Sequence, residues 1–278
     1  MNKSIGRVGI ARKFFLFGTV ATTLAVTAWQ SSAQIVTLTD INSVAQINTA
    51  SQAGMFNWIV DGQDQLAQQW FWYRVGPVGP ESSVNTISAP TIITPNAKTL
   101  NVSYNNGAYA VAINYTLNGQ APGSGLSGLG ELIRISNFTA APLDFHFYQY
   151  SDFDLGGPNS VQLTKNLFTG LYNIADQVGT GATLSETVAT PGANHGEAGL
   201  FPFTLNRLND GLATTLNDNN SAGPGDTTWA FEWDLTIPAG SSFDINKALS
   251  LAVPEPSSVA LISLGIMAGA FRKRRTSL

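Results

Sequence analysis

The sequence of 278 residues contains no cysteine and only two histidines, His146 and His195. Without cysteine, neither a disulfide framework nor thiol chemistry is available. A zinc site built from histidine alone is excluded as well, because zinc sites use three or four protein ligands. Both absences narrow the chemistry that the chain can carry out.

Charged residues are also scarce, at 12% of the chain. Eight of the fourteen basic residues lie near the two ends, so the segment from Gln34 to Val253 has six basic residues against seventeen acidic ones, a net charge of −11. An acidic body repels phosphate backbones. We therefore expect no nucleic-acid partner.

The short motifs of common enzyme classes are missing too. The sequence has no phosphate-cradling loop, no dinucleotide fingerprint and no zincin motif. Ser127, in the stretch GLSGL, lacks the second glycine of a serine nucleophile elbow. We therefore expect a protein without a cofactor and without enzymatic activity.

The first 33 residues are typical of a secretory signal peptide. A basic region, MNKSIGRVGIARK, precedes an apolar stretch from Phe14 to about Ala28. Small residues then favour cleavage between Ala33 and Gln34. An uncleaved membrane anchor is the alternative, but the apolar stretch is shorter than the ~20 residues of a spanning helix.

The C-terminal tail, residues 253–278, combines three features in a fixed order. They are the triplet Pro254, Glu255 and Pro256, the apolar run Ser257–Phe271, and the basic end Arg272, Lys273, Arg274 and Arg275. A helix over the apolar run would measure about 22 Å, which is short of the ~30 Å hydrocarbon core of a bilayer. The basic end would stay on the cytoplasmic side. A plain anchor or a buried terminal helix is the alternative.

This tail closely resembles the PEP-CTERM protein-sorting signal, with Pro254, Glu255 and Pro256 matching its signature triplet. The resemblance implies recognition by an exosortase, an integral-membrane enzyme of Gram-negative bacteria, after transient insertion in the inner membrane. It also implies an exported protein of the cell surface or extracellular matrix, linked to exopolysaccharide and biofilm. The body, which includes QQWFWYRVG, resembles uncharacterised proteins with the same tail, and that resemblance implies no activity.

Alternating apolar and polar residues dominate the body and predict an all-β fold. In TTWAFEWDLTI, Trp229, Phe231 and Trp233 share one face, and Glu232 and Asp234 share the other. Such strands are usually half-buried, with one face in solvent. About ten of them, separated by short turns, predict one antiparallel β-sandwich or jelly-roll domain over residues 34–252, between a signal-peptide helix and a short C-terminal hydrophobic helix.

Other strands are predicted at Phe56–Val60, Gln69–Val75, Thr99–Tyr104, Ala108–Leu117, Glu131–Phe138, Leu143–Asp152, Leu167–Ala175, Ala182–Ala189 and Ser242–Leu249. Short helices are predicted only at Ser43–Gln52 and Phe203–Gly211. The stretch Ala121–Gly130, APGSGLSGLG, predicts a flexible loop.

Two groups of aromatic and polar residues form a possible ligand face. In WFWYR, Trp70 and Trp72 share one face of a strand, and either a planar sugar-binding platform or a strand buried on both faces would explain them. His146, Tyr148 and Tyr150 share one face of another strand, where a mononuclear metal site or an acid–base pair is possible. The alternative for that strand is an exposed, decorated face.

Two loops rich in Asp, Asn and Gly could hold Ca²⁺ through oxygen ligands. The candidate ligands are Asp152 and Asp154 in SDFDLGGPNS, and Asp218 and Asn220 in NDNNSAGPGD. Ala222 and Trp229 occupy positions where a Ca²⁺ loop requires ligands, so ordinary turns are the alternative.

These observations favour an exported, non-enzymatic protein of the cell surface or matrix. A carbohydrate-binding module is the first alternative, and it requires an exposed aromatic platform. A hydrolase of matrix glycans or lipids is the second alternative. Its structural sign would be two convergent carboxylates, or His146 facing a second titratable group.

Overall fold

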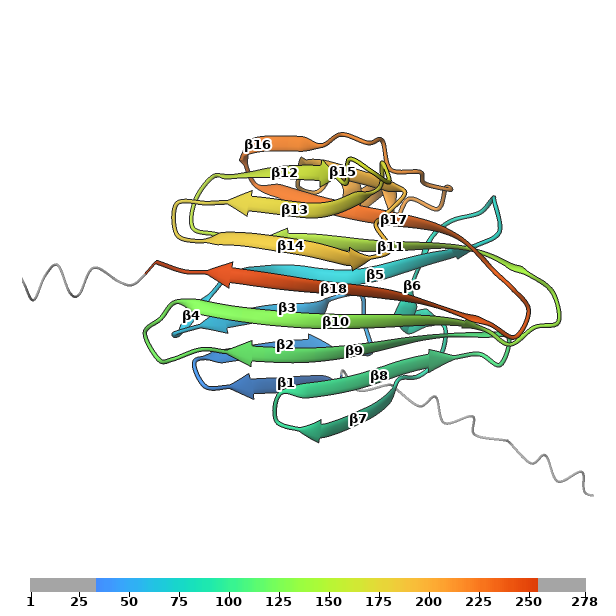
Figure 1. Ribbon diagram of the computed structural model, residues 1–278, viewed down its shortest axis with the longest axis horizontal. Coiled ribbons are helices and arrows are strands. Elements are labelled where there is room, and N and C mark those ends of the chain that lie inside the picture. The colour runs from blue at the N-terminus through green and yellow to red at the C-terminus, as the bar shows by residue number, and fades with distance from the viewer. Residues whose placement is uncertain (1–33, 255–278) are drawn as a thin grey trace, which may run out of the picture. The chain divides into compact units, whose positions relative to one another are not determined.

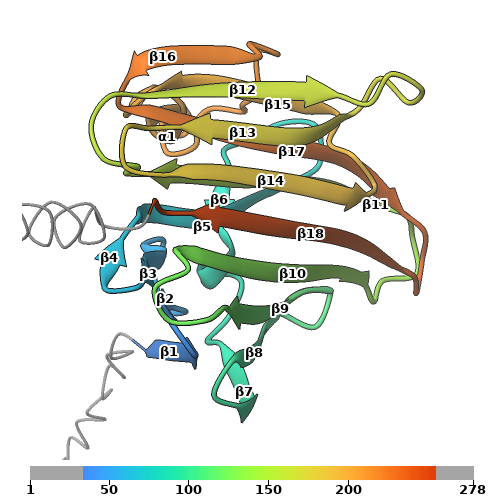
Figure 2. The same cartoon turned by 60° about the vertical axis from the view of Figure 1, so that its left-hand side comes forward.

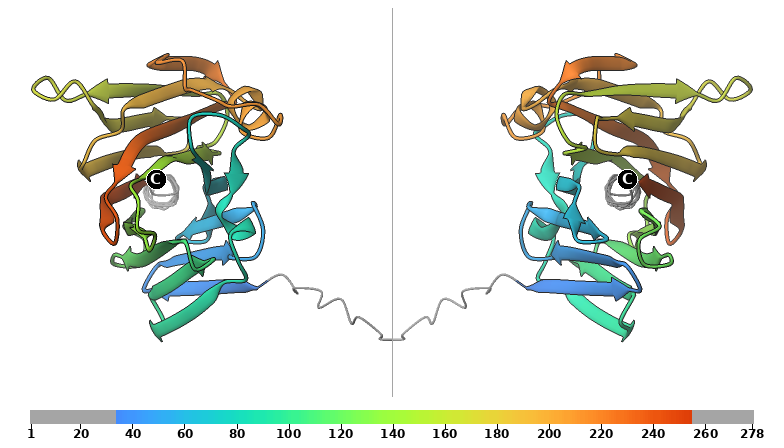
Figure 3. Two further views of the ribbon diagram at one scale, coloured as in Figure 1. Left: turned by 90° about the vertical axis from the view of Figure 1, so that its right-hand side faces the viewer. Right: turned by 90° about the vertical axis from the view of Figure 1, so that its left-hand side faces the viewer.

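The computed structural model describes residues 34–254, which form two nine-stranded sheets packed face to face (Figure 1). Viewed from either end, the two sheets face each other across a shared core (Figure 3). The predicted all-β, sandwich-like fold is confirmed, with almost all strand pairs antiparallel. The predicted signal-peptide helix and C-terminal helix lie outside the described residues.

The first sheet, sheet A, contains both strands of the predicted ligand face at its centre. Its order is β1 (Ile35–Asp40), β2 (Ser43–Asn48), β3 (Gly54–Val60), β5 (Leu66–Val75), β11 (Leu143–Phe153), β17 (Thr227–Ile237) and β15 (His195–Leu200), with β4 (Gln63–Asp64) beside β3 and β6 (Ser82–Ser83) beside β5. All of its pairs are antiparallel except β3 with β5.

The second sheet, sheet B, is fully antiparallel and is seen face-on in Figure 2. Its order is β16 (Ser221–Gly225), β12 (Asn159–Lys165), β13 (Tyr172–Val178), β14 (Thr183–Thr190), β18 (Ser242–Ala252), β10 (Leu126–Asn137), β9 (Tyr109–Gly119), β8 (Thr99–Asn105) and β7 (Thr91–Asn96). The helical elements among residues 34–254 are η1 (Val84–Thr86) and α1 (Phe203–Arg207).

Aromatic side chains fill much of the core between the sheets. Phe153 stacks on Trp229 with ring centroids 5.5 Å apart, and its ring meets Trp58 edge-on at 6.2 Å. All three side chains are fully buried. Offset and edge-to-face contacts of this kind contribute about 0.5–1.5 kcal/mol each beyond area burial, so this end of the core is rigid.

Three predictions about local structure are wrong. Ser43–Gln52 is not a helix: Ser43–Asn48 forms β2, because Ala45 and Ile47 alternate into the core while β1 and β3 pair on either side. Leu126–Gly130 lies in β10 rather than in a loop. The strand predicted from Leu167 begins only at Tyr172. The helix predicted at Phe203 is confirmed as α1.

Within residues 34–254, no helix combines the length and the apolar composition needed to cross a bilayer.

Candidate functional site

The face of sheet A that points away from sheet B is covered by residues 202–219, here called the covering segment, which consists of α1 and the irregular chain that follows it. Three buried carboxylates hold it through backbone N–H groups. Leu216 N donates to Glu232 at 2.8 Å, Thr214 N donates to Glu81 at 2.9 Å, and Asn217 N donates to Glu197 at 3.0 Å. Hydrogen bonds to charged acceptors are worth about 1.5–3 kcal/mol each, so this segment is firmly attached.

The covering segment and the loop around β6 bury the predicted aromatic platform. Trp70, Trp72, Tyr148 and Tyr150 share the predicted face, but each of them is 0% exposed. Trp70 Nε1 donates to Ser83 and Trp72 Nε1 donates to Asn209. An exposed platform built from Trp70 and Trp72 is therefore wrong, and the alternative of a strand buried on both faces is correct.

Both histidines of the chain converge on the same carboxylate at one end of this face. His146 lies directly opposite Asp234 across the β11–β17 pair, and its Nδ1 contacts Asp234 Oδ1. From the other side of β17, His195 Nε2 lies 3.6 Å from Asp234 Oδ2. We call His146, His195 and Asp234, together with Glu232, the histidine cluster.

Further carboxylates surround the histidine cluster. His146 Nε2 is 3.5 Å from Asp144, its Nδ1 is 3.8 Å from Glu232, and His195 Nδ1 is 3.2 Å from Asp218. The imidazole rings and three of the carboxylates are partly exposed, whereas Glu232 is fully buried. The cluster therefore presents several hydrogen-bonding groups to solvent around one buried acid.

Burial raises the pKa of Glu232 to about 7, and the nearby charge of Asp234 adds to the shift against the effect of the Leu216 N–H. A carboxyl group with a pKa near neutrality exchanges its proton at physiological pH, which is the property of a general acid or base. The cluster could also hold a cation, since ligand atoms of His146, Glu232 and Asp234 lie within 4.8 Å of one another.

The predicted Ca²⁺ ligands are divided between two places. Asp218 lies beside His195. The backbone carbonyl of Asn220 pairs with β12, where it accepts a hydrogen bond from Leu163 N at 2.7 Å. Asp152 and Asp154 instead meet Asp226, with carboxylate oxygens within 4.8 Å of one another. Asp226 lies in one of the two predicted loops, but sequence spacing did not single it out.

This three-aspartate cluster is electrostatically unfavourable when all its members are ionised. Asp152 is 5% exposed, and its Oδ1 has no hydrogen-bond partner. Burial raises the pKa of Asp152 to about 7, with repulsion from Asp226 and Asp154 adding to it. The folded chain therefore holds a proton here that the unfolded chain has released at the same pH.

The pKa of Asp152 predicts that stability falls as pH rises. The usual pKa of an unfolded aspartate is about 3.9, so the native state binds the extra proton between about pH 4 and the native pKa of about 7. Across that window the free energy of unfolding should decrease by about 4 kcal/mol through this group. Asp152→Asn, which mimics the protonated form, should therefore be more stable than the parent at pH 8 and similar to it below pH 4.

Urea unfolding followed by circular dichroism at several pH values measures this difference. Asp176→Asn, at an exposed position of β13, is the matched control and should shift stability little at any pH. A stability difference between parent and Asp152→Asn that does not change with pH would contradict the expected proton uptake. Calcium binding stays a prediction, now with Asp226 as third ligand: millimolar Ca²⁺ at pH 8 should stabilise the parent more than Asp152→Asn.

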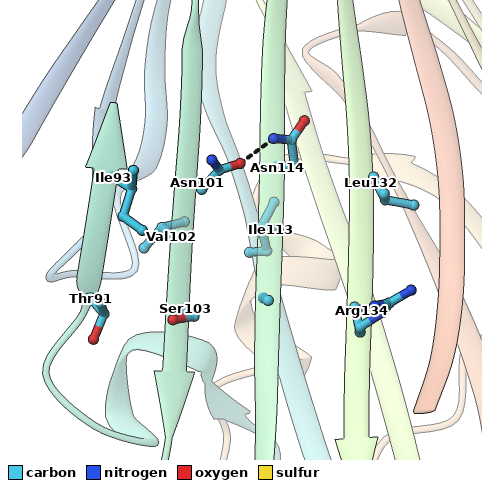
Figure 4. Close-up of a pocket in the computed structure, with 10 residues that line it drawn as sticks. Thr91, Ile93, Asn101, Val102, Ser103, Ile113, Asn114, Leu132 and Arg134 are labelled. Atoms are coloured by element: carbon cyan, nitrogen blue, oxygen red, sulfur yellow. Dashed lines mark hydrogen bonds between the residues drawn. The ribbon is translucent and has the colours of Figure 1, made fainter. Parts of the chain in front are cut away.

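A separate pocket of about 330 Å³ lies on the outer face of sheet B (Figure 4). The side chains of Asn101 and Asn114 are hydrogen-bonded to each other at its wall, and Ile93, Leu132 and Arg134 complete much of its lining. It combines amide, guanidinium and aliphatic groups, and it shares no residue with the histidine cluster. Sequence reasoning did not identify it.

Residues 252–275 match the PEP-CTERM protein-sorting motif, which confirms the resemblance of the tail. The motif marks the chain as an exported protein that is processed by an exosortase and associated with the cell envelope. It begins at the last residue of β18, and Val253 N donates to Gly125 O at 2.8 Å. Glu255, Pro256 and the basic end lie outside the described residues, as do Ala33 and the predicted cut before Gln34.

Solved structures similar to this chain share its fold at very low identity. A putative aldose 1-epimerase from Escherichia coli K12 has a TM-score of 0.56 and 11% identity, over 79% of this chain and 99% of its own. A bacterial glucoamylase complexed with acarbose has a TM-score of 0.55 and 10% identity, and the match covers 84% of this chain and 35% of the glucoamylase. A galactose mutarotase-like protein from Lactobacillus casei has a TM-score of 0.50 and 8% identity, and the match covers 79% of this chain and 100% of that protein. No curated protein matches the sequence.

Proposed function

We propose that this exported protein binds carbohydrate outside the cell, through the histidine cluster on sheet A. The observation that carries the proposal is the convergence of His146 and His195 on Asp234 from strands on either side of β17. Adjacent carboxylate and imidazole groups are suited to paired hydroxyl groups of a sugar ring, because a carboxylate accepts two hydrogen bonds and an imidazole both donates and accepts.

The fold agrees with this proposal. Three structures with the same fold are described as an aldose 1-epimerase, a galactose mutarotase-like protein and a glucoamylase in complex with acarbose. Their activities are their own, and what supports carbohydrate binding here is the chemistry of the cluster together with export. Since the sorting tail delivers the chain to the envelope, an exopolysaccharide of the same cell is the ligand that we propose, with a role in the biofilm matrix.

Isothermal titration calorimetry with purified exopolysaccharide, and with mono- and oligosaccharides derived from it, tests the proposal. The parent protein should bind, and Asp234→Ala should bind about tenfold or more weakly, as expected for loss of a charged hydrogen-bonding group. Arg134→Ala, in the pocket on sheet B, is the matched control and should bind as the parent does. Absence of binding by the parent, or loss of binding only in Arg134→Ala, would overturn the assignment to the histidine cluster.

Proton transfer to a bound sugar is a second candidate function, which the raised pKa of Glu232 specifically favours. Glu232 has no exposed surface, so its proton would reach a bound sugar through His146, whose Nδ1 lies 3.8 Å away. A linked acid and base of this kind are suited to proton-transfer catalysis. Polarimetry of freshly dissolved aldoses would detect accelerated interconversion of anomers. If the parent accelerates it and Glu232→Gln does not, the cluster is catalytic. If neither protein does so while the parent binds sugar, the function is binding alone.

A further inference from the structure

A second polar cluster lies at the centre of the molecule, between the two sheets. Lys247 of β18, Glu131 of β10 and Glu186 of β14 have side chains that are 0% exposed. Lys247 lies opposite Glu131 across the β10–β18 pair and contacts its carboxylate, and its Nζ is 3.3 Å from Glu186 Oε1. The histidine cluster and the sorting tail use none of these residues.

A carboxamide from the opposite sheet completes this cluster. Gln149 of β11 is fully buried, and its Oε1 contacts Lys247 Nζ. Its Nε2 donates to Glu186 Oε2 at 2.6 Å. An amine, a carboxamide and a carboxylate are thus held in mutual contact, and the ring of Phe71 lies 5.3 Å from Lys247 Nζ.

We propose that Lys247 and Gln149 form an intramolecular isopeptide bond that links the two sheets covalently. The contact between Lys247 Nζ and Gln149 Oε1 holds the amine beside the carboxamide group that it would attack, and proximity of this kind replaces a chance encounter of the two groups. Burial removes competing water, and the rigid strands on both sides hold the pair in this geometry for the lifetime of the folded protein.

The reaction balances without any cofactor or oxidant. Glu186 takes one proton from the Lys247 ammonium group through Oε1, and the free amine attacks Cδ of Gln149. A second proton moves from Nζ to Nε2 of Gln149, by way of the Glu186 carboxyl group that touches both nitrogens. The Cδ–Nε2 bond breaks, ammonia leaves, and an amide between Nζ and Cδ remains with Glu186 protonated.

Charge at the buried cluster is compatible with this route. Burial raises the pKa of Glu131, and the neighbouring charge of Glu186 raises it further against the effect of Lys247. The reaction leaves the net charge of the cluster unchanged, because the proton that Lys247 releases is kept by Glu186. One ammonium charge and one carboxylate charge are removed together, so the reaction creates no new uncompensated charge in the core.

Peptide mapping of the purified, folded full-length chain by mass spectrometry tests the cross-link. Trypsin should release residues 135–165, which contain Gln149, joined to a peptide that spans an uncleaved Lys247. The mass of the pair should be the sum of both peptides less one ammonia, and fragmentation should place the bond at these two residues. Localisation is needed because residues 135–165 also contain Gln162, whose carboxamide would lose ammonia with the same change in mass.

Two variants separate the chemistry from folding. Lys247→Arg should give only linear peptides, and Glu186→Gln should fold by circular dichroism yet slow or abolish the link, because it cannot accept the proton. Linear peptides ending at Lys247 in the folded parent would overturn the proposal. A bond from Lys247 to Glu131 or Glu186 with loss of water would overturn Gln149 as the partner. Unchanged cross-linking in folded Glu186→Gln would overturn the role of Glu186.

Discussion

Replacing Glu81 with alanine should lower the free energy of unfolding by about 3–5 kcal/mol. Glu81 pairs with Arg74 at 3.0 Å, and both side chains are almost completely buried. Without the carboxylate, Arg74 would remain buried with an uncompensated charge, and Thr214 N would lose its acceptor. The covering segment should loosen at the same time, because one of its three carboxylate attachments is gone.

The matched control is an ion pair of the same type on the surface. Arg134 and Asp244 pair across sheet B at 2.7 Å, with side chains 57% and 44% exposed. Exposed pairs contribute about 0–1 kcal/mol, so Arg134→Ala should change stability little. Urea unfolding followed by circular dichroism compares the two variants. A loss in Glu81→Ala no larger than that in Arg134→Ala would contradict the assigned role of the buried pair.

The strands and their two faces could be predicted from the sequence, but their environment could not. The alternation in β11 and β17 places Phe145 and Trp233 on the inner face and His146 and Asp234 on the outer face, as the observed register confirms. The outer face was expected in solvent. The covering segment, which comes from another part of the chain, buries most of this outer face instead. The local alternation of residues in a strand does not predict that a distant segment will pack on it.

The proximity of the site residues to one another could not be predicted from the sequence either. His146 and His195 lie on strands that flank β17 without pairing with each other, so their approach depends on the strand order of sheet A. Asp226 lies close to Asp152 and Asp154 because β17, which begins directly after Asp226, pairs with β11. The buried polar cluster around Lys247, by contrast, is indicated by a local sequence pattern. Lys247 lies between Ile245 and Leu249 among the alternate residues of β18 that point into the core. A charge in that phase indicates a paired partner inside the core.

Ending the chain at Val253 should leave the domain intact but remove it from the envelope. Val253 is 4% exposed and is the last buried residue among residues 34–254, whereas Pro254 is exposed. The stability of the chain that ends at Val253 should therefore match that of the full-length chain. Cell fractionation should find the full-length protein processed at the envelope and the shortened one absent from it, because only the full chain carries the complete sorting motif.

A second, slightly shorter chain separates folding from sorting. Ending at Ala248 also removes Leu249, Leu251 and Val253, which are buried, and it unpairs the end of β18 from both β10 and β14. At about 1.5–3 kcal/mol for each buried aliphatic side chain, the loss should approach or exceed the whole stability of an ordinary domain. Equal stability of the two shortened chains would contradict the role of β18 as a central strand. Retention of the chain ending at Val253 at the envelope would contradict sorting through the tail.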